Sequence, residues 1–465
     1  MRKRMIGAMA VLMLGGMTAA QARAPEHVRA DARAILEKTV AMPTSVGLGQ
    51  VPTMAQYLAD RFRAAGFPED DIHILPSGET ASLVVRYRGS GKGGKPILVI
   101  AHMDVVTAKP EDWERDPFRL IEENGYFYGR GTMDIKGEIA LITATFLRLK
   151  AEKFVPSRDL IIAFSGDEET TFNTTRELAN KYRALTDAEF ALNGDGGGGS
   201  LDEATGQPRY YQVQGAEKSY ASFALTARNP GGHSSQPRPD NAIYDLAAAL
   251  TALQGFSFPV MWNDWTIGGF KAAAAATPGA TGEAMARFAR NPQDAEAAAE
   301  LAKVPALVGR TRTTCVATML QGGHADNALP QSATATVNCR VFPGHALEQV
   351  RASLQQVVGD RIEVTVVGNP FTSPPSPLRD DVQAAVAKAV HASYPGVAIV
   401  PDQAPYATDG SIFRVAGIPT YGVSSLFMKE SDEFAHGLNE RIPVASFYAG
   451  LDHWYTLLTT LAARK

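Results

Sequence analysis

The sequence predicts an α/β protein that carries an inserted α+β domain, and three observations lead to this fold class. Short apolar runs such as residues 96–101 and 160–164 alternate with amphipathic helical stretches, a pattern typical of strands buried on both faces of a sheet and covered by helices. After about Tyr210 the strands alternate polar and apolar residues, which is typical of an antiparallel sheet. A Pro-rich joint at residues 369–377 then returns the chain to the first pattern.

The elements follow in chain order. The first part of the larger domain spans residues 25–213, with strands expected at residues 82–87, 96–101, 160–164 and 190–192. The inserted domain spans residues 214–368, with strands at 222–226, 315–319 and 362–366 and helices at 241–253 and 347–358. Inside it, the Ala-rich residues 271–307 are expected to form helices that decorate the domain. Residues 369–465 complete the larger domain, which is therefore discontinuous.

Composition and charge limit the classes of function. The 465-residue chain has 45 Lys and Arg against 49 Asp and Glu, for a formal net charge of -4. This balance provides no basic field that would gather phosphate backbones. Nucleic acid is therefore not expected as a partner.

The N-terminus predicts export. The basic residues 2–4 precede an apolar run at residues 5–17 and then a small-residue stretch whose A-x-A sites end at Ala22 or Ala24. This is the plan of a secretory signal peptide, and the apolar run is shorter than the roughly 20 residues that span a bilayer. We therefore expect residues 1–24 to be removed, leaving a periplasmic or secreted protein with no stable membrane span.

The two cysteines, Cys315 and Cys339, both lie in β-like segments of the inserted domain. A cross-strand disulfide and two buried free thiols are both consistent with this placement, and the sequence leaves the choice open. Two cysteines do not make a disulfide-built scaffold, so a large hydrophobic core is expected to hold the chain together.

Histidine and acidic residues follow the buried strands, at the edge where open α/β sheets form their sites. His102 and Asp104 follow the strand at residues 96–101, and Asp104 is expected to accept the second imidazole N–H of His102 and so fix the tautomer that binds metal. The alternative is a salt-bridged loop pair. Asp134 lies in a Gly-rich loop that enters a helix; a phosphate cradle is the weaker interpretation, because the loop is neither a P-loop nor a Rossmann fingerprint.

Three further segments add carboxylates and a second histidine. Residues 167–169 place three consecutive acids at the end of another strand, which is costly unless a cation or solvent compensates them. Asp195 follows a further strand and precedes four glycines, and His436 lies near the C-terminus. A di-metal hydrolytic site uses a set of this kind, two histidines and three carboxylates: His102, Asp134, Glu169, Asp195 and His436.

The order of these segments resembles the zinc metallopeptidase family of aminoacylase, carboxypeptidase S, acetylornithine deacetylase and succinyl-diaminopimelate desuccinylase. The resemblance covers nearly the whole chain after residue 24 and rests on ordered motifs that include His102-Met103-Asp104, Asp167-Glu168-Glu169, Gly231-Gly232-His233-Ser234-Ser235 and His436-Gly437-Leu438-Asn439-Glu440. It implies a zinc-exopeptidase catalytic domain, with a mixed central sheet between helices, and an inserted ferredoxin-like lid that also serves for dimerisation.

The resemblance also implies residue roles at the metal site. Asp134 would bridge two Zn²⁺ ions, with His102 and Asp195 on one and Glu169 and His436 on the other; Co²⁺ or Mn²⁺ could replace Zn²⁺. Glu168 would be the general base, and Asp104 would orient His102.

In the inserted domain, the resemblance makes His233 the residue that polarises the scissile carbonyl, often across a homodimer interface. Asn327 and Arg340 would hold the free carboxylate of the substrate, and Gly410, in the larger domain, would contact the substrate through its backbone. The remaining histidines are expected to be structural: His27, His73, His324, His345, His391 and His453.

One difference from the family pattern leaves two substrate classes open. Aminoacylases and carboxypeptidases of the family usually carry Glu where this chain has Asp195, and relatives with Asp are more often dipeptidases or aminopeptidases. Residues 310–314, by contrast, resemble carboxypeptidase S and acyl-amino-acid hydrolases. We therefore expect a di-zinc dipeptidase or carboxypeptidase that cleaves the amide beside a free C-terminal carboxylate, with an N-acyl-amino-acid deacylase as the alternative. A silent binding protein is disfavoured because all five ligands and Glu168 are present, and phosphoryl transfer because no phosphate loop is found.

Overall fold

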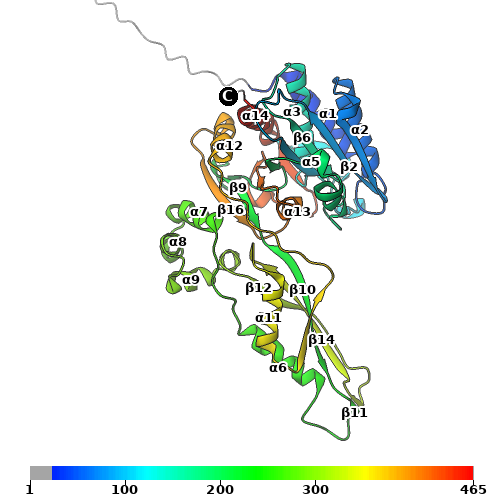
Figure 1. Ribbon diagram of the computed structural model, residues 1–465, viewed down its shortest axis with the longest axis vertical. Helices are drawn as coiled ribbons and strands as arrows, with labels where there is room; N and C mark the ends of the chain where they lie inside the picture. The colour runs from blue at the N-terminus through cyan, green and yellow to red at the C-terminus, as the bar shows by residue number, and fades with distance from the viewer. Residues whose placement is uncertain (1–22, 464–465) are drawn as a thin grey trace, which may run out of the picture.

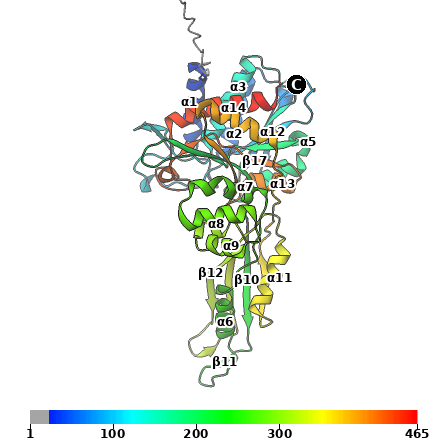
Figure 2. The same ribbon diagram turned by 90° about the vertical axis from the view of Figure 1, so that its left-hand side faces the viewer.

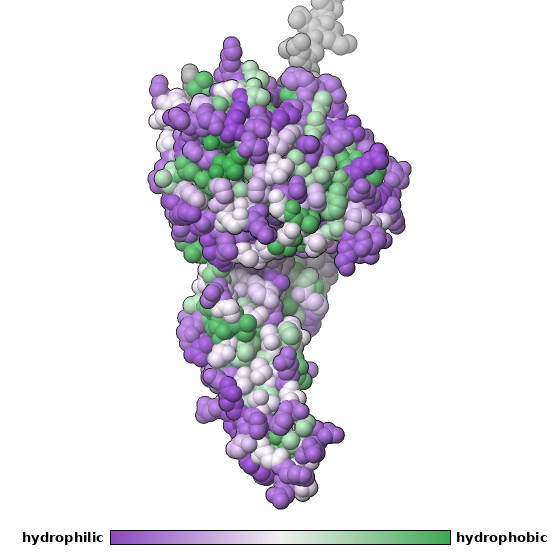
Figure 3. Space-filling model, turned by 90° about the vertical axis from the view of Figure 1, so that its right-hand side faces the viewer, coloured by the Kyte–Doolittle hydropathy of each residue, from purple (hydrophilic) through white to green (hydrophobic). Residues whose placement is uncertain are grey.

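The computed structural model describes residues 23–463, so the predicted signal peptide lies almost wholly outside the described residues. A narrow arm projects from a larger domain (Figure 1). Hydrophobic side chains form patches on the arm as well as on the larger domain (Figure 3). Within the described part of the chain, no helix is long and apolar enough to cross a membrane.

The larger domain is built on one mixed sheet, in the strand order β1-β2-β6-β3-β7-β17-β9-β8-β18, with β16 paired to β9. Its centre is parallel, because β3 pairs in parallel with both β6 and β7 and β7 with β17. The ten strands are β1 (Ile72–Ser77), β2 (Thr80–Tyr87), β3 (Ile97–His102), β6 (Leu160–Ser165), β7 (Phe190–Asn193), β8 (Gly198–Leu201), β9 (Pro208–Glu217), β16 (Ala398–Ala404), β17 (Thr420–Gly422) and β18 (Phe427–Met428). The apolar runs that predicted central strands are thus confirmed.

Helices cover both faces of this sheet. Alternate residues of each central strand point to opposite faces, so the strands contribute apolar side chains to two separate cores. In β3, Ile97 and Val99 pack into one core and Leu98 and Ile100 into the other. Helices α1 (Glu26–Val40), α2 (Val51–Ala64), α3 (Lys136–Ala151), α12 (Asp380–Ser393) and α14 (Val444–Leu461) cover the first face. The second face is covered mainly by α13 (Asp409–Val415) and the segment from α4 (Asn173–Arg176) to α5 (Arg183–Thr186). A small separate sheet joins β4 (Ile121–Glu123), β5 (Tyr126–Tyr128) and β19 (Arg441–Pro443).

The arm, called the lid from here on, is a four-stranded antiparallel sheet in the order β12-β14-β10-β15. Two helices pack on one face of it. The order of these strands and helices along the chain is β-α-β-β-α-β, the ferredoxin-like arrangement. The elements are β10 (Ser219–Arg228), α6 (Ala242–Gln254), β12 (Thr314–Gly322), β14 (Ser332–Val341), α11 (Leu347–Val358) and β15 (Ile362–Val367), with a short ladder of β11 (Gly232–His233) and β13 (Ala328–Leu329) at the tip. The predicted fold class is confirmed in both domains.

Cys315 and Cys339 face each other across the β12–β14 ladder and form a disulfide. Of the two alternatives that the sequence allowed, the structure therefore shows the cross-strand bridge. It ties the edge strand β12 to β14, its neighbour in the lid sheet.

The Ala-rich segment is helical, as predicted, but it does not pack on the lid sheet. Its helices are α7 (Asp264–Ala273), α8 (Gly279–Arg290), α9 (Ala295–Ala302) and α10 (Pro305–Val308), and they lie at the junction of lid and larger domain (Figure 2). Trp265 of α7 is fully buried in the core of the larger domain, where its indole N–H donates to Ser376 O (2.7 Å). This helical segment therefore joins the two domains, which differs from its expected place as a decoration of the lid.

Candidate active site

The five predicted metal ligands come together at one edge of the central sheet. His102 ends β3, Asp195 lies two residues beyond β7, and Glu169 lies in the turn after β6. Because β3, β6 and β7 are parallel, their carboxyl ends meet at the same edge. Asp134, just before α3, and His436, in the loop before β19, approach this edge from the helical side and from the C-terminal part of the chain.

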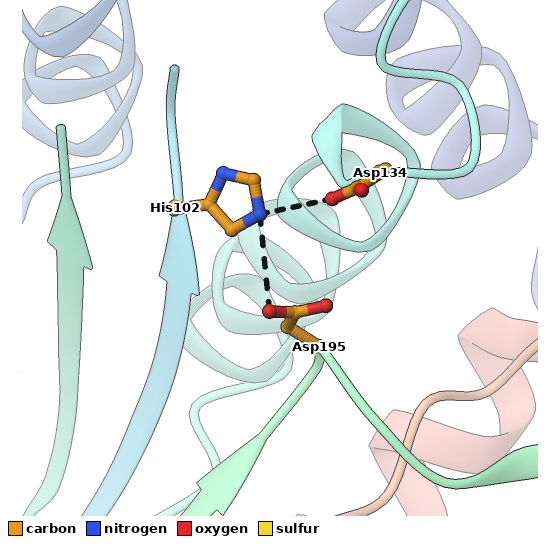
Figure 4. A group of neighbouring side chains, drawn as sticks. All are labelled: His102, Asp134 and Asp195. Atoms are coloured by element: carbon orange, nitrogen blue, oxygen red, sulfur yellow. Dashed lines mark hydrogen bonds and ion pairs between the residues drawn. The ribbon is translucent and has the colours of Figure 1, made fainter. Parts of the chain in front are cut away.

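These ligands form two groups that share Asp134. In the first, His102 Nε2 lies 3.0 Å from Asp134 Oδ1 and 3.9 Å from Asp195 Oδ2 (Figure 4). In the second, His436 Nε2 lies 3.1 Å from the other Asp134 oxygen and 2.9 Å from Glu169 Oε2. In each group the ligand atoms lie within 4.8 Å of one another. Imidazole nitrogen and carboxylate oxygen are ligands that Zn²⁺ and similar divalent ions accept, so the donor set of each group fits such an ion, and Asp134 would contribute to both groups.

Asp104 supports this site differently from the sequence expectation. The closest acceptor for His102 Nδ1 is the backbone carbonyl of Asp104 at 3.0 Å, whereas the carboxylate lies at 3.5 Å. The Asp104 carboxylate instead accepts the backbone N–H groups of Glu168 (3.1 Å) and Glu169 (3.0 Å). The carbonyl therefore fixes the histidine tautomer, and the side chain holds the turn that carries the other two acids.

Like charges and burial set the electrostatics of the site. The pKa of Glu168 is raised well above its ordinary value, mainly because the side chain is buried and also because Asp195, Asp409 and Glu169 lie near. Burial likewise raises the pKa of Asp195. The pKa of His436 is raised to about 10 by its hydrogen bonds to Asp134 and Glu169. Without cations the acids and histidines thus hold protons between them, and a metal pair would displace these protons.

Glu440 is a residue whose role sequence reasoning missed. It is fully buried, and its carboxylate accepts the backbone N–H groups of Met133 (2.7 Å) and Asp134 (3.0 Å) as well as that of Gly131 (3.0 Å). It also pairs with the buried Arg130 guanidinium at 2.7 Å.

The same Arg130 side chain donates to the carbonyls of His436 (3.3 Å) and Gly437 (3.1 Å). The Arg130–Glu440 pair therefore fixes the backbone on both sides of the second ligand group. Glu440 belongs to the motif quoted for His436, but only the fold shows that it contacts the Asp134 loop.

The backbone N–H of Gly410, a residue to which the resemblance assigns a backbone contact with the substrate, is already hydrogen-bonded within the protein. Gly410 is buried at the start of α13, and its N–H donates to Thr408 Oγ1 (3.1 Å). The neighbouring Asp409 carboxylate accepts hydrogen bonds from the hydroxyls of Ser165 and Thr175, and burial raises its pKa to about 7. This turn therefore ties the start of α13 to the end of β6 and to α4, on either side of the three consecutive acids.

The predicted lid residues fall at two places, the tip and the opposite end of the lid sheet. His233 and Asn327 are exposed at the lid tip, where Ser234 N donates to Asn327 O (3.0 Å), and β11 marks this tip at the far end of the arm (Figure 1). Arg340 lies at the opposite end of the lid sheet, paired with Tyr220 and Thr314. The ten-residue strand β14 separates the two positions, a span of roughly 30 Å at the usual rise per residue.

Comparisons with known proteins agree with the fold and the site described above. Residues 98–460 match the profile of Peptidase family M20/M25/M40. The human N-fatty-acyl-amino acid synthase/hydrolase PM20D1 is 26% identical over 463 residues, and the match covers 91% of this chain and 89% of the relative. The probable carboxypeptidase S-like 2 of Dictyostelium discoideum is 27% identical over 402 residues, and the match covers 81% of this chain and 74% of the relative. Among solved structures, the M20 family metallo-carboxypeptidase Sso-CP2 of Sulfolobus solfataricus has a TM-score of 0.68 at 18% identity and covers 93% of this chain and 100% of its own.

We expect Glu440→Gln to weaken metal binding by about 10- to 100-fold, because it removes the charge that pairs with buried Arg130 and orients the Asp134 loop. The measurement is metal retained after dialysis against graded chelator concentrations. Glu114→Gln, a change at an exposed glutamate, is the matched control and should retain metal as the unmodified protein does. Equal retention by the Glu440 variant would show that the loop does not need this carboxylate.

Metal loading should release protons, because His436 is protonated below about pH 10 in the metal-free protein and must be neutral to bind. Affinity for Zn²⁺ is therefore expected to fall as the pH falls, by about tenfold per unit from this group alone. Calorimetric titrations at pH 7.5 in two buffers of different ionisation enthalpy measure the released protons. We expect at least one per protein, and no dependence on the buffer would contradict the assignment.

Proposed function

The chain belongs to Peptidase family M20/M25/M40 and is a metal-dependent peptidase or amidohydrolase, and within this family we propose that it hydrolyses the amide bond beside a free C-terminal carboxylate in dipeptides or short peptides. Membership confirms the resemblance found in the sequence. The substrate class does not follow from family membership alone and is part of the proposal. It is supported by the metal-ligand groups, by Glu168 and by Arg340.

One observation carries the chemistry: two ligand groups share Asp134, and buried Glu168 lies beside them. Two divalent metal ions, which we propose to be Zn²⁺, would polarise the scissile carbonyl and make water more acidic. His102 and Asp195 would hold one ion and Glu169 and His436 the other.

Glu168 would act as the general base. Burial raises its pKa above that of an exposed glutamate, which makes its carboxylate a stronger base for taking a proton from the attacking water and delivering it to the leaving nitrogen. Burial also keeps bulk water from competing for that proton. Arg340 would bind the free carboxylate of the substrate through the planar guanidinium fork.

The alternative is an N-acyl-amino-acid deacylase on the same residues. The human relative's name assigns it N-fatty-acyl amino acids, whereas the Dictyostelium relative is described as a carboxypeptidase. Both activities cleave an amide beside a free carboxylate and differ only in the group on the acyl side. Asp195 favours the peptidase, because the shorter acid leaves room for a free ammonium group.

We further propose a homodimer formed through the lid. The edge strand β12 exposes Val316, Met319 and Leu320 (60%, 59% and 67% exposed), and its outer edge has no strand partner among the described residues. An exposed apolar edge of this kind is a template for pairing with another chain. In a single chain the tip residue His233 lies far from the metal ligands, so a second copy would have to bring its own tip to this site.

We also propose that the protein is exported. The N-terminal residues have the three-part plan of a signal peptide, and the disulfide between Cys315 and Cys339 is of the kind that persists in oxidising compartments. N-terminal sequencing of the protein from the periplasm or medium should find Arg23 or Pro25 first. A mature chain that begins at Met1 would exclude cleavage.

The proposed function is tested with Ala-Leu, N-acetyl-Leu and N-lauroyl-Leu, each with and without chelator. We expect chelator-sensitive cleavage of Ala-Leu; cleavage of the acyl compounds alone would make the protein a deacylase. The paired variant is Glu168→Gln, which should lower kcat by about 100- to 10,000-fold while metal content stays unchanged. A Glu168→Gln variant with undiminished kcat would refute the role of Glu168 as the base.

The dimer is tested with Leu320→Lys, which places a charge on the exposed β12 edge. We expect the molar mass from light scattering to halve and the activity to fall at least tenfold, because His233 could no longer reach a second site. Val155→Lys, on an exposed residue of the larger domain, is the control and should change neither quantity. A monomeric unmodified protein with full activity would refute the dimer.

A further inference from the structure

A cavity of about 640 Å³ lies at the junction of the lid and the larger domain, and we call it the junction cavity. This volume is in the range of sites for small ligands. Its walls come from Lys218 between β9 and β10, the loop after α6, Arg340 of β14, the end of β16 and the segment from α10 to β12. The segment from α10 to β12 therefore closes one side of the junction cavity.

Three cations on these walls have no acidic partner. Within residues 23–463, no carboxylate lies within ion-pair distance of Lys218, Arg312 or Arg340, whereas the fourth cation, Arg310, pairs with Asp402 at 2.6 Å. Arg312 Nε is buried without any hydrogen-bond partner in the described residues. A buried donor left unsatisfied is costly, so an anionic ligand would be stabilised here.

Burial makes the charged form of two of these side chains, Lys218 and Arg312, less stable. Lys218 is 2% exposed and donates to Arg312 O (3.0 Å) and Thr314 Oγ1 (3.2 Å), which leaves one of its three ammonium donors free. Burial and the nearby charge of Arg340 lower its pKa to about 7, and burial lowers the pKa of Arg312. An anion in the cavity would relieve both penalties.

Hydrogen bonds connect the cavity wall to the metal site. Lys218 N donates to Ala404 O (3.0 Å), and the preceding residue, Glu217, accepts both the N–H (2.9 Å) and the hydroxyl (2.8 Å) of Thr408. Thr408 Oγ1 in turn accepts from Asn193 Nδ2 (3.0 Å), and Asn193 lies two residues before the ligand Asp195. These contacts connect the cavity wall to the end of β7, the strand that precedes the ligand Asp195.

We propose that the junction cavity binds the C-terminal residue of the substrate and selects a residue with a second carboxylate in its side chain. This inference rests on the proposed function, in which Arg340 binds the α-carboxylate. One carboxylate leaves cationic charge uncompensated; a second, on the side chain, would pair with Arg312, and Lys218 would donate its free N–H.

The apolar part of the wall favours the same ligand. Phe256, Phe258 and Val308 line the cavity, and such side chains lower the local dielectric, which strengthens an ion pair formed beside them. They also accept the methylene groups of an acidic side chain. A purely apolar side chain would fill the same volume but would leave the buried Arg312 Nε without a hydrogen-bond partner.

The test compares substrates that end in Glu, Gln or Leu, each carrying an alanyl or an N-acetyl group. Glu and Gln differ in charge but hardly in shape, so we expect kcat/KM to be at least about tenfold higher for Glu than for Gln. In Arg312→Gln this Glu/Gln ratio should fall to within about threefold of one, and Arg312→Lys should restore part of it. The matched control Arg361→Gln removes an exposed lid cation that is paired with Asp245 outside the cavity and should keep the ratio.

Two results would overturn the inference: equal or faster cleavage of the Gln or Leu substrates by the unmodified protein, or a Glu/Gln ratio that Arg312→Gln does not change. If the metal-loaded protein cleaves none of the six compounds, the proposed function fails. Calorimetric binding of free glutamate and glutamine then decides the inference separately. Tighter binding of glutamate that Arg312→Gln abolishes would support it, and equal binding would overturn it.

Discussion

The crowding of carboxylates at one edge of the central sheet is the constraint on which the rest of the structure depends. Asp134, Glu169 and Asp195 meet there beside buried Glu168, and burial together with their mutual repulsion raises the pKa of both Glu168 and Asp195. Only divalent cations or bound protons compensate such a cluster. The surrounding contacts hold the acids in place against this repulsion, since Asp104 fixes the turn of Glu168 and Glu169, and Glu440 fixes the loop of Asp134.

The sequence predicts the parts of this arrangement that follow from the sheet. Apolar runs locate β3, β6 and β7, and parallel strands bring their carboxyl ends to one edge, so His102, Glu169 and Asp195 could be placed together from the order of residues alone. His436 has no such local reason, because its loop reaches the site only through the fold of the C-terminal part. Its assignment depended on the resemblance of its motif to a known family.

Long-range contacts explain what the sequence could not provide. The Arg130–Glu440 pair joins residues 310 positions apart, and no periodicity reports such a contact. The disulfide depends on strand register, since Cys315 and Cys339 must face each other. The place of helices α7 to α10 is decided by Trp265, which enters the core of the larger domain although the segment after it is rich in alanine. For Asp104, the sequence predicted the correct neighbour of His102 but not which of its oxygens lies nearest the imidazole.

The spread of the ligands along the chain, from His102 to His436, has a consequence for biosynthesis. The second ligand group lacks its histidine until 436 of the 465 residues have been made, so a growing chain cannot assemble the complete pair of binding groups. An ion held by the second group would therefore be acquired at or after the end of translation, wherever the finished chain folds. Because sites of this donor type choose between similar divalent ions partly by what is available, the compartment in which the protein folds would help to decide which metal it carries.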